Sequence, residues 1–322
     1  MTIDNHIDPP LVTIGIPTYN NAAYLEDAVR SVLNQDYPNL EIIVLDDAST
    51  DNTAEITAAL STNPRITCHK NETNLGRVAT YRKCLYELAK GDWYLNLDGD
   101  DYLTDPYYIS KAVGWISQQK NVVMVTGAVE RLIDGKLHYV IHSDYGEELS
   151  CVDGKDYFLN IPSKKTYFSH LATLYHRQKA MELGFYGEDI ISADYESLNR
   201  LVLTGNVISY DKVVGVWRIH GGNETIQKIN SVDQIMKNFT FIEKPALFAQ
   251  AYLDKAAVHK WRTENLVIVI ESYIAKTLIE RPSHSFSLLA RIFGRYPGLF
   301  IRACWNMLVR KAKKGFGAGK GK

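Results

Sequence analysis

The sequence predicts an α/β fold with a mostly parallel sheet flanked by helices, followed by a C-terminal helical appendage. Short apolar runs alternate with stretches of helical spacing through the first hundred residues, which is typical of β-α-β units. Polar clusters follow three of the apolar runs, at the edge where open parallel sheets bind ligands. With 322 residues, 46% of them hydrophobic, the chain is long enough for one large domain and an appendage.

The predicted elements alternate in order along the chain. Apolar and β-branched runs predict strands at residues 11–16, 41–45, 66–69 and 93–97. Apolar residues recurring every three or four positions predict helices at residues 21–34, 51–60 and 77–88. Further along, we expect a helix that ends near residue 204, a strand at residues 213–216, and helices beyond Thr225.

The cysteines and the N-terminus bear on the cellular compartment. The cysteines are scattered without a C-x-x-C pair, at Cys68, Cys84, Cys151 and Cys304, so we expect neither a zinc site nor a disulfide framework. The first residues lack a basic start followed by an apolar run, and no segment of about 18 apolar residues occurs. We therefore expect a reducing, cytoplasmic setting, without secretion or a membrane span.

The segment YLNLDGDDYL, residues 94–103, places three carboxylates in four positions after an apolar strand. Such like charges repel, so a positive group is expected among them. Asp98 and Asp100 flank a glycine that permits tight curvature, and converging carboxylates suit Mn²⁺ or Mg²⁺ on a substrate diphosphate. The pattern predicts a metal-diphosphate site; the alternative is a polar turn before a helix near Asp105.

Two further polar clusters follow predicted strands, PTYN at residues 17–20 and DDASTD at residues 46–51. The Ser, Thr and Asp of the second cluster suit a helix N-terminus. Asp46 and Asp47 lie at the end of the strand itself, where a carboxylate could accept a hydrogen bond from the N–H of a uracil or related ring. We expect the three clusters to line one cleft.

Taken together and in order, these segments resemble the GT-A glycosyltransferases of family 2, which use nucleotide-sugar donors. The resemblance lies in VTIGIPTYNNAAYLEDAVRSVLNQDYPNLEIIVLDDASTDNT, NETNLGR, GDWYLNLDGDD, GEDIISADYESLNRLVLTG and WRIHGGNET. It implies a catalytic domain at residues 1–225, with a nucleotide-sugar half at about 11–103 and an acceptor half at about 104–225. Residues 226–322 would form the helical C-terminal region.

The resemblance also implies roles in donor binding. The residues implied for the nucleotide sugar are Pro17, Thr18, Tyr19, Asp47, Arg77 and Asp98. The first four would enclose the base and ribose, with Asp47 favoured over Asp46, and Asp98 would approach the donor ribose or sugar. UDP is the expected nucleotide by family habit, while GDP and dTDP stay open.

Metal and base roles are implied in the same way. Asp100 would ligate Mn²⁺ or Mg²⁺, and His220 would add a metal or diphosphate contact unless its role is structural. Asp194 is the candidate catalytic base, in a place where family members often carry an acidic pair at the start of a helix. Glu188 and Asp189 form an alternative pair, and Asp194 could instead only stabilise its helix.

The implied activity is an inverting, metal-dependent sugar transfer to a hydroxyl of a glycan or polyprenyl-linked acceptor, in bacterial surface polysaccharide assembly. A nucleotidyltransferase is one alternative, but it would usually show a Gly-rich basic loop near the first strand, and PTYN lacks one. A non-catalytic scaffold that binds sugar nucleotides is the other.

The C-terminal segment differs in charge from the rest. Residues 281–322 contain ten Lys and Arg and no Asp or Glu, with arginines interleaved among Leu, Ile, Phe and Trp. This pattern predicts that residues 284–322 lie on an anionic membrane surface, which places the protein on the inner face of the cell membrane. The alternative is a core-packing helix with a solvated tail. Nucleic acid is not an expected partner, because the remaining residues are acidic overall.

Overall fold

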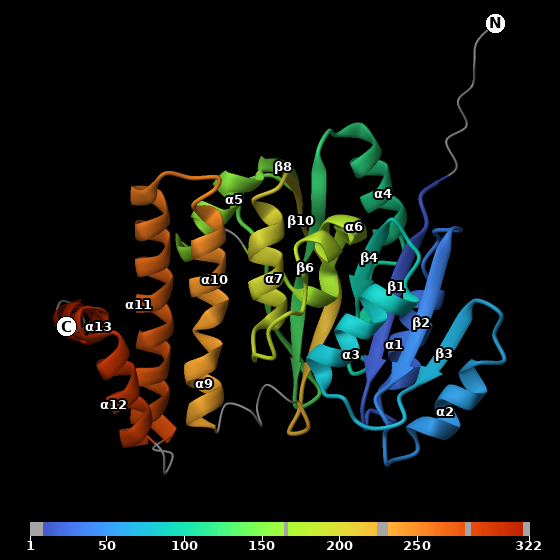
Figure 1. The fold of residues 1–322 in the computed structure, drawn as a ribbon, viewed down its shortest axis with the longest axis horizontal. Coiled ribbons are helices and arrows are strands. Elements are labelled where there is room, and N and C mark those ends of the chain that lie inside the picture. The colour runs from blue at the N-terminus through green and yellow to red at the C-terminus, as the bar shows by residue number, and fades with distance from the viewer. Residues whose placement is uncertain (1–8, 164–166, 224–230, 281–284, 318–322) are drawn as a thin grey trace, which may run out of the picture. The chain divides into compact units, whose positions relative to one another are not determined.

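The computed structural model describes residues 9–163, 167–223, 231–280 and 285–317. The chain divides into two compact units. The first consists of Met1–Asp189 and Ala193–His220, and the second of Ile190–Ser192 and Gly221–Lys322. The first unit holds the sheet and the second is helical (Figure 1).

The first unit alternates strands and helices as the sequence predicts (Figure 1). Its strands are β1 Val12–Thr18, β2 Leu40–Asp46, β3 Ile66–Lys70, β4 Trp93–Asn96, β5 Tyr102–Leu103, β6 Val122–Ile133, β7 Lys136–Ile141, β8 Leu149–Asp153, β9 Thr173–His176 and β10 Asn206–Ile219. Its α-helices are α1 Leu25–Leu33, α2 Thr53–Leu60, α3 Arg77–Lys83, α4 Tyr108–Gln118, α5 Gly154–Asn160, α6 Arg177–Glu182 and α7 Ala193–Val202.

The strands form one sheet in the order β3-β2-β1-β4-β9-β6-β10-β5. The half from β3 to β4 is entirely parallel, because helical crossovers connect its strands. The other half is mixed: β6 and β10 pair in parallel, whereas β9, β5, β7 and β8 join as antiparallel strands. The predicted α/β class is confirmed, whereas the antiparallel strands β5, β7, β8 and β9 were not predicted.

Pro17 lies inside β1, although the sequence predicts that it ends this strand. The pairing of β1 with β4 stops at Gly15, so the missing N–H of Pro17 removes no ladder hydrogen bond on that side. Its carbonyl instead accepts a hydrogen bond from the N–H of Gly99, at 3.0 Å. The strand therefore continues to Thr18, beside the turn that carries the three carboxylates.

The core of the first unit forms where α1 packs on the sheet. The buried face of this helix consists of Leu25, Ala28, Val29 and Val32, at the spacing expected of an amphipathic helix. These side chains belong to one cluster with the apolar residues of β1 and β2. Full burial of each large aliphatic side chain contributes roughly 1.5–3 kcal/mol, which fixes the strand ends that carry the polar clusters.

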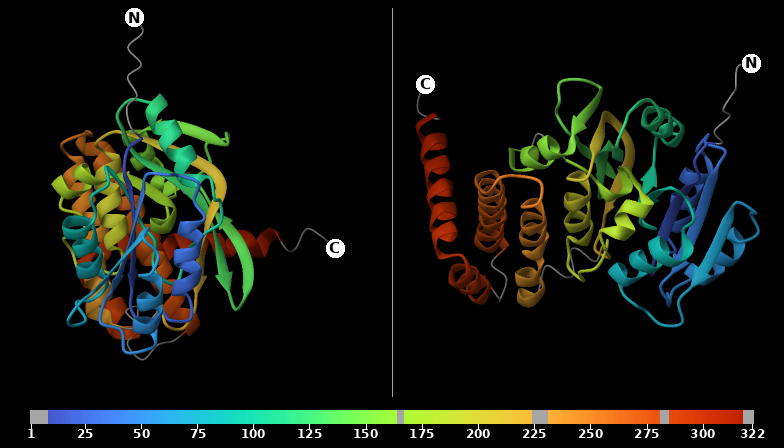
Figure 2. Two further views of the ribbon diagram at one scale, coloured as in Figure 1. Left: turned by 90° about the vertical axis from the view of Figure 1, so that its right-hand side faces the viewer. Right: turned by 45° about the horizontal axis from the view of Figure 1, so that its top comes forward.

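The second unit consists of helices, as predicted beyond Thr225. They are α9 Val232–Asn238, α10 Thr240–Ala249, α11 Lys255–Glu280, α12 Ser285–Arg295 and α13 Pro297–Gly317. Glu243 of α10 accepts hydrogen bonds from Arg262 of α11 and from Tyr296, which lies between α12 and α13. The chain turns sharply between α12 and α13, as the right-hand view of Figure 2 shows. No helix of the described residues is long and apolar enough to cross a membrane.

Candidate active site

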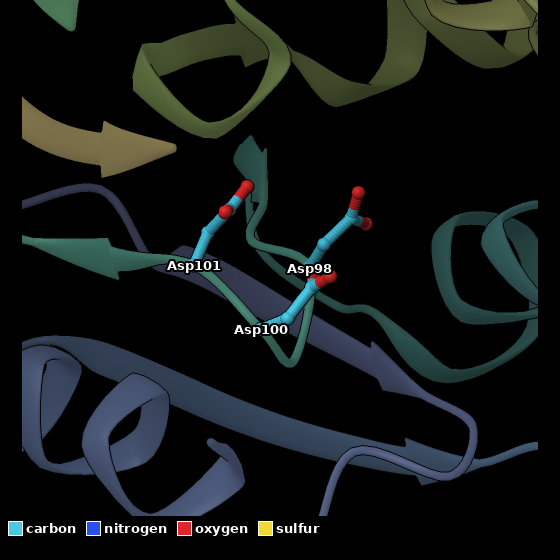
Figure 3. Close-up of side chains that lie close together, drawn as sticks. All are labelled: Asp98, Asp100 and Asp101. Carbon is cyan, nitrogen blue, oxygen red and sulfur yellow. The ribbon is translucent and has the colours of Figure 1, made fainter. Parts of the chain in front are cut away.

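Three carboxylates meet on the turn that follows β4. One oxygen of each of Asp98, Asp100 and Asp101 lies within 4.8 Å of the others (Figure 3). The turn runs along the end of β1, where the N–H of Leu97 donates to Gly15 O at 2.9 Å. The sheet therefore brings together two of the three polar strand ends for which the sequence predicts a shared cleft.

Gly99 is required by a close approach between this turn and β1. A Cβ atom at this position would lie 2.7 Å from Thr18 Oγ1. The φ angle of Gly99 is not in the left-handed region, so glycine serves here to make room rather than to permit an unusual backbone conformation. This close approach places the turn that carries Asp98 and Asp100 directly beside the end of β1.

Burial and neighbouring charges raise the pKa of two of these carboxylates. Burial, together with the neighbouring charge of Asp100, raises the pKa of Asp98 to about 7. Burial and the charges of Asp100 and Asp98 raise the pKa of Asp101 well above its usual range. This repulsion would be relieved by a cation, and carboxylate oxygens are the ligands that Mg²⁺ and Mn²⁺ prefer. The residues therefore fit a divalent metal.

The end of β10 closes the other side of the cluster. His220 Nε2 lies 3.0 Å from Asp100 Oδ2, so the two residues predicted to bind metal are neighbours. The N–H of Arg218 donates to Asp101 Oδ1 at 2.9 Å, and its guanidinium donates to the carbonyl of Asp100 at 3.2 Å. The Tyr24 ring lies 4.8 Å from the His220 ring, between centroids. The carboxylate of Asp101 is thus hydrogen-bonded to the backbone of β10, whereas the carboxylate of Asp100 lies beside the imidazole of His220.

Asp98 is held by two residues that sequence reasoning did not identify. The Tyr81 hydroxyl donates to Asp98 Oδ1 at 2.5 Å, and Asn96 Nδ2 donates to the same oxygen at 3.1 Å. Both donors therefore fix one oxygen and orient the other. The signal in the sequence is weak: Asn96 is a polar residue inside an apolar strand, and Tyr81 lies in a helix beyond the NLGR segment.

The predicted nucleotide residues lie at the neighbouring strand ends. Thr18 is buried and Tyr19 is 44% exposed, at the C-terminal end of β1. The N–H of Asp47 donates to Thr18 O at 2.9 Å, which joins the ends of β1 and β2. The PTYN and DDASTD segments are thus adjacent, as the sequence predicts.

Asp46 and Asp47 both organise loops. Asp46 Oδ1 accepts hydrogen bonds from the N–H and hydroxyl of Ser49. Asp47 accepts hydrogen bonds from the N–H groups of Leu75 and Gly76, at 2.8 and 2.9 Å, and from the side chain of Asn71. Gly76 has a φ of 87°, a conformation that favours glycine. Asp47 therefore fixes the loop that places Arg77.

Arg77 extends from this loop toward the carboxylates. Its guanidinium lies 5.3 Å from the centroid of the Tyr81 ring. Its positive charge also lowers the pKa of Asp98, although less than burial and Asp100 raise it. The six residues predicted to bind a nucleotide sugar thus lie around the ends of β1, β2 and β4, together with the start of α3.

Asp194 lies in the first turn of α7 and is partly buried. Its charge contributes to the raised pKa of Asp98, which places it within electrostatic range of the cluster. The alternative acids precede the helix, with Glu188 partly buried and Asp189 exposed. Behind Asp194, the buried pair Glu196 and Arg200 is joined at 2.6 Å and holds the helix.

A histidine lies within electrostatic range of Asp194 and Arg77. His170 Nε2 lies 2.6 Å from the Tyr186 hydroxyl, and that hydroxyl lies 3.0 Å from the hydroxyl of Tyr175. Burial lowers the pKa of His170 from 6.5 to about 4, although the charge of Asp194 opposes this shift. The imidazole is therefore uncharged near neutral pH, and sequence reasoning did not single it out.

Comparison with known proteins identifies the family. The model of the family described as Glycosyl transferase family 2 matches residues 13–184, more than half of the chain. The chain therefore belongs to glycosyltransferase family 2, which confirms the resemblance found in its motifs.

Two curated relatives differ in how much of them the chain covers. The hyaluronan synthase of Pasteurella multocida is 41% identical over 102 residues, which is 31% of this chain but 10% of the synthase. An uncharacterized glycosyltransferase of Rickettsia prowazekii (strain Madrid E) is 25% identical over 272 residues, which is 82% of this chain and 81% of the relative. The chain thus matches one small part of the first relative and most of the second.

Solved structures share the fold. S. aureus TarS in complex with UDP has a TM-score of 0.68 at 19% identity, covering 91% of this chain and 80% of that chain. A mannosyltransferase from Pyrobaculum calidifontis, in complex with GDP-Man and Mn²⁺, has a TM-score of 0.54 at 20% identity, covering 92% and 88%. At these identities the likeness establishes the fold, and the predicted GT-A class is confirmed.

Proposed function

We propose that this family 2 enzyme transfers a sugar from a nucleoside-diphosphate sugar to an acceptor hydroxyl, with inversion at the anomeric carbon. The observation that carries the proposal is the cluster of Asp98, Asp100 and Asp101 beside His220, at the strand ends that also carry PTYN and Asp47. Buried, closely spaced carboxylates, two of which have a raised pKa, are suited to a cation and a diphosphate.

The donor would lie across the ends of β1, β2 and β4. Pro17, Thr18, Tyr19 and Asp47 would enclose the base and ribose, and Arg77 would contact the nucleotide. Asp98 would accept a hydrogen bond from a hydroxyl of the ribose or sugar. It would use Oδ2, because Tyr81 and Asn96 both donate to Oδ1. UDP is the proposed nucleotide, supported by the UDP bound to the TarS structure.

The proposed metal is Mn²⁺ or Mg²⁺, held by Asp100 and His220. Carboxylate and imidazole suit Mn²⁺ in particular, and the Pyrobaculum mannosyltransferase of the same fold was solved with Mn²⁺. When bound, the cation supplies positive charge that stabilises the departing diphosphate. Arg218 would hold this site in place, because it fixes both Asp100 and Asp101.

Asp194 is the proposed catalytic base. It would take the proton from the acceptor hydroxyl as that oxygen attacks the anomeric carbon from the face opposite the leaving group. The new bond joins the acceptor oxygen to the anomeric carbon, and the bond that breaks releases the nucleoside diphosphate. One carboxylate suffices for this inverting route, because no covalent intermediate forms.

The acceptor is proposed to be a glycan or polyprenyl-linked glycan in bacterial surface polysaccharide assembly. The matches to a hyaluronan synthase and a chondroitin synthase of Pasteurella multocida support this choice. A polyprenyl-linked acceptor would place the reaction at the cytoplasmic face of the cell membrane, with the protein bound peripherally.

Turnover of a donor panel tests the proposal. Wild-type protein is incubated with UDP-, GDP- and dTDP-sugars and Mn²⁺, and released nucleoside diphosphate is measured. We expect release from one donor class, and about 100- to 1,000-fold less from Asp100→Asn. Asp134→Asn is the matched control, because Asp134 lies in an exposed turn at a φ of 50°, which asparagine tolerates.

The same assay separates the alternatives. Pyrophosphate released from nucleoside triphosphates and sugar phosphates would identify a nucleotidyltransferase. Nucleotide binding without release of nucleoside diphosphate from any donor would identify a scaffold and contradict the proposal. Equal release by Asp100→Asn and Asp134→Asn would also contradict it.

A further inference from the structure

Helices α12 and α13 expose large apolar side chains to solvent. Ile301, Trp305 and Leu308 of α13 are 61%, 66% and 62% exposed. Their spacing of four and three residues places them on one side of the helix. We call these three residues the α13 stripe. The opposite side contains the buried Ala303, so α13 already has a packed face and the stripe is additional to it.

The apolar surface continues from α13 onto α12. Phe286 and Phe293 are exposed and lie seven residues apart, on one side of α12. Phe293 meets Phe300 edge to face, with ring centroids 5.6 Å apart, across the turn between the helices. Leu288 and Ile292 are buried and supply the packed face of α12. Apolar side chains of the two helices therefore meet across the turn that joins them.

Positive charge borders this surface. Exposed Arg302 lies on one flank of the α13 stripe and exposed Lys311 on the other. Residues 281–322 contain ten Lys and Arg and no acid. Arg291 and Arg310 pair with acids of their own unit, Asp233 and Glu271. The border of the stripe is thus basic on both sides.

We propose that the α13 stripe and the adjoining face of α12 bind an anionic lipid surface. An apolar stripe bordered by Lys and Arg is the pattern of a helix that lies in the membrane interface, where basic residues near the surface are attracted to anionic lipid. A second copy of the chain is disfavoured, because a symmetric dimer through this face would set the same basic border against itself. The occupant is therefore anionic lipid.

This inference builds on the proposed function by naming the surface that would hold the enzyme near a lipid-linked acceptor. It depends on side chains far from the acid cluster in sequence and on lipid rather than nucleotide. Its test therefore needs no sugar transfer, and each of the two proposals can fail without the other.

Flotation of the full chain with vesicles tests the proposal. One set of vesicles is pure phosphatidylcholine, and the other is an equal mixture with phosphatidylglycerol. We expect binding to the anionic vesicles that weakens with added salt, and little binding to the neutral ones. The triple variant Ile301→Gln/Trp305→Gln/Leu308→Gln should bind about tenfold more weakly or worse, since it removes most of the apolar contact.

Two controls make the test specific. Leu247→Gln changes an exposed leucine of α10 in the same unit and should bind as the wild type does. Of the five tryptophans, Trp305 is the exposed one, so anionic vesicles should shift tryptophan emission to the blue. Trp305→Phe should keep the binding and lose the shift.

Three results would overturn the proposal. The first is equal binding to neutral and anionic vesicles, and the second is undiminished binding by the triple variant. The third is a wild-type dimer in sedimentation that the triple variant converts to a monomer, which would assign the surface to a second copy. Unchanged nucleotide binding by the triple variant would show that a loss of vesicle binding does not reflect misfolding.

Discussion

In the first unit, three carboxylates lie within 4.8 Å of one another at the end of the sheet, whereas in the second unit three large apolar side chains of α13 face solvent. The first arrangement is unfavourable without a cation, because burial and repulsion raise the pKa of Asp98 to about 7. The second is unfavourable without an apolar partner. In each unit, a ligand would relieve the unfavourable arrangement: a cation at the three carboxylates, and an apolar partner at the α13 stripe.

The difference also concerns how each feature is built. The acid cluster is fixed from several sides, by β1, by Tyr81 and by the end of β10. The α13 stripe depends on helical spacing alone, and its three side chains are exposed. We therefore expect substitutions in the first unit to change chemistry without changing lipid binding, and substitutions in the stripe to do the reverse.

The largest effect is expected at the proposed base. Asp194→Asn should lower kcat by about 100- to 10,000-fold, because general base catalysis of this kind contributes that much. Vesicle binding should be unchanged. The assay is release of nucleoside diphosphate at saturating donor and acceptor.

The alternative acids provide the comparison for this variant. Glu188→Gln and Asp189→Asn, measured in parallel, should each retain activity within about tenfold of the wild type. A larger loss in either of them than in Asp194→Asn would transfer the role of base to that pair.

A smaller effect is expected from Tyr81→Phe. The variant loses the 2.5 Å hydrogen bond to Asp98 but keeps the ring and its packing. A hydrogen bond to a charged group contributes about 1.5–3 kcal/mol, so kcat/KM should fall roughly 10- to 100-fold. Tyr107→Phe is the control, because Tyr107 is exposed. Equal activity in both variants would show that Tyr81 does not position Asp98.

In the second unit, we expect a substitution at Glu243 to lower the stability of the protein. Glu243→Gln weakens the hydrogen bonds that Arg262 and Tyr296 donate to this carboxylate. We expect a loss of about 1–2 kcal/mol in the free energy of unfolding and a lower midpoint in thermal melting. Glu264→Gln, on the same helix as Arg262, should melt as the wild type does. Unchanged melting of Glu243→Gln would mean that these contacts add little.

A further effect is expected in the dependence of stability on pH. His170 has a pKa of about 4 in the fold against 6.5 when exposed, so the unfolded chain binds a proton that the folded chain does not. Its contribution should be present above pH 6.5 and be lost as the pH falls toward 4. In His170→Gln, melting midpoints should fall less over this range. The groups that face the imidazole are Asp194, Arg77, Tyr81 and Tyr186.

Much of the first unit could be predicted from local pattern. The four parallel strands and their helices have strong periodicity and clear turn residues, and their ends needed only small corrections such as Pro17 in β1. The strands β5, β6, β7, β8 and β9 were not predicted. Their formation depends on partners distant in the sequence, and local pattern carries little of that information.

The site could be predicted where chemistry and spacing coincide. Asp98, Asp100 and His220 carry types of side chain that bind metal or sugar, in segments that resemble the family, and the fold brings them together. Tyr81 and His170 were missed because a tyrosine in a helix and a lone histidine have ordinary structural roles in most proteins. Only the folded chain places them against Asp98 and near Asp194.

The most direct test of the metal-diphosphate site is to measure the binding of UDP, GDP and dTDP by calorimetry, in Mn²⁺ and in EDTA. The variants are Asp100→Asn and the control Asp134→Asn. We expect tight binding of one nucleotide that requires Mn²⁺, is lost in Asp100→Asn and persists in Asp134→Asn. Binding that is equally strong in EDTA, or equal in both variants, would contradict the metal-diphosphate site at the end of β4.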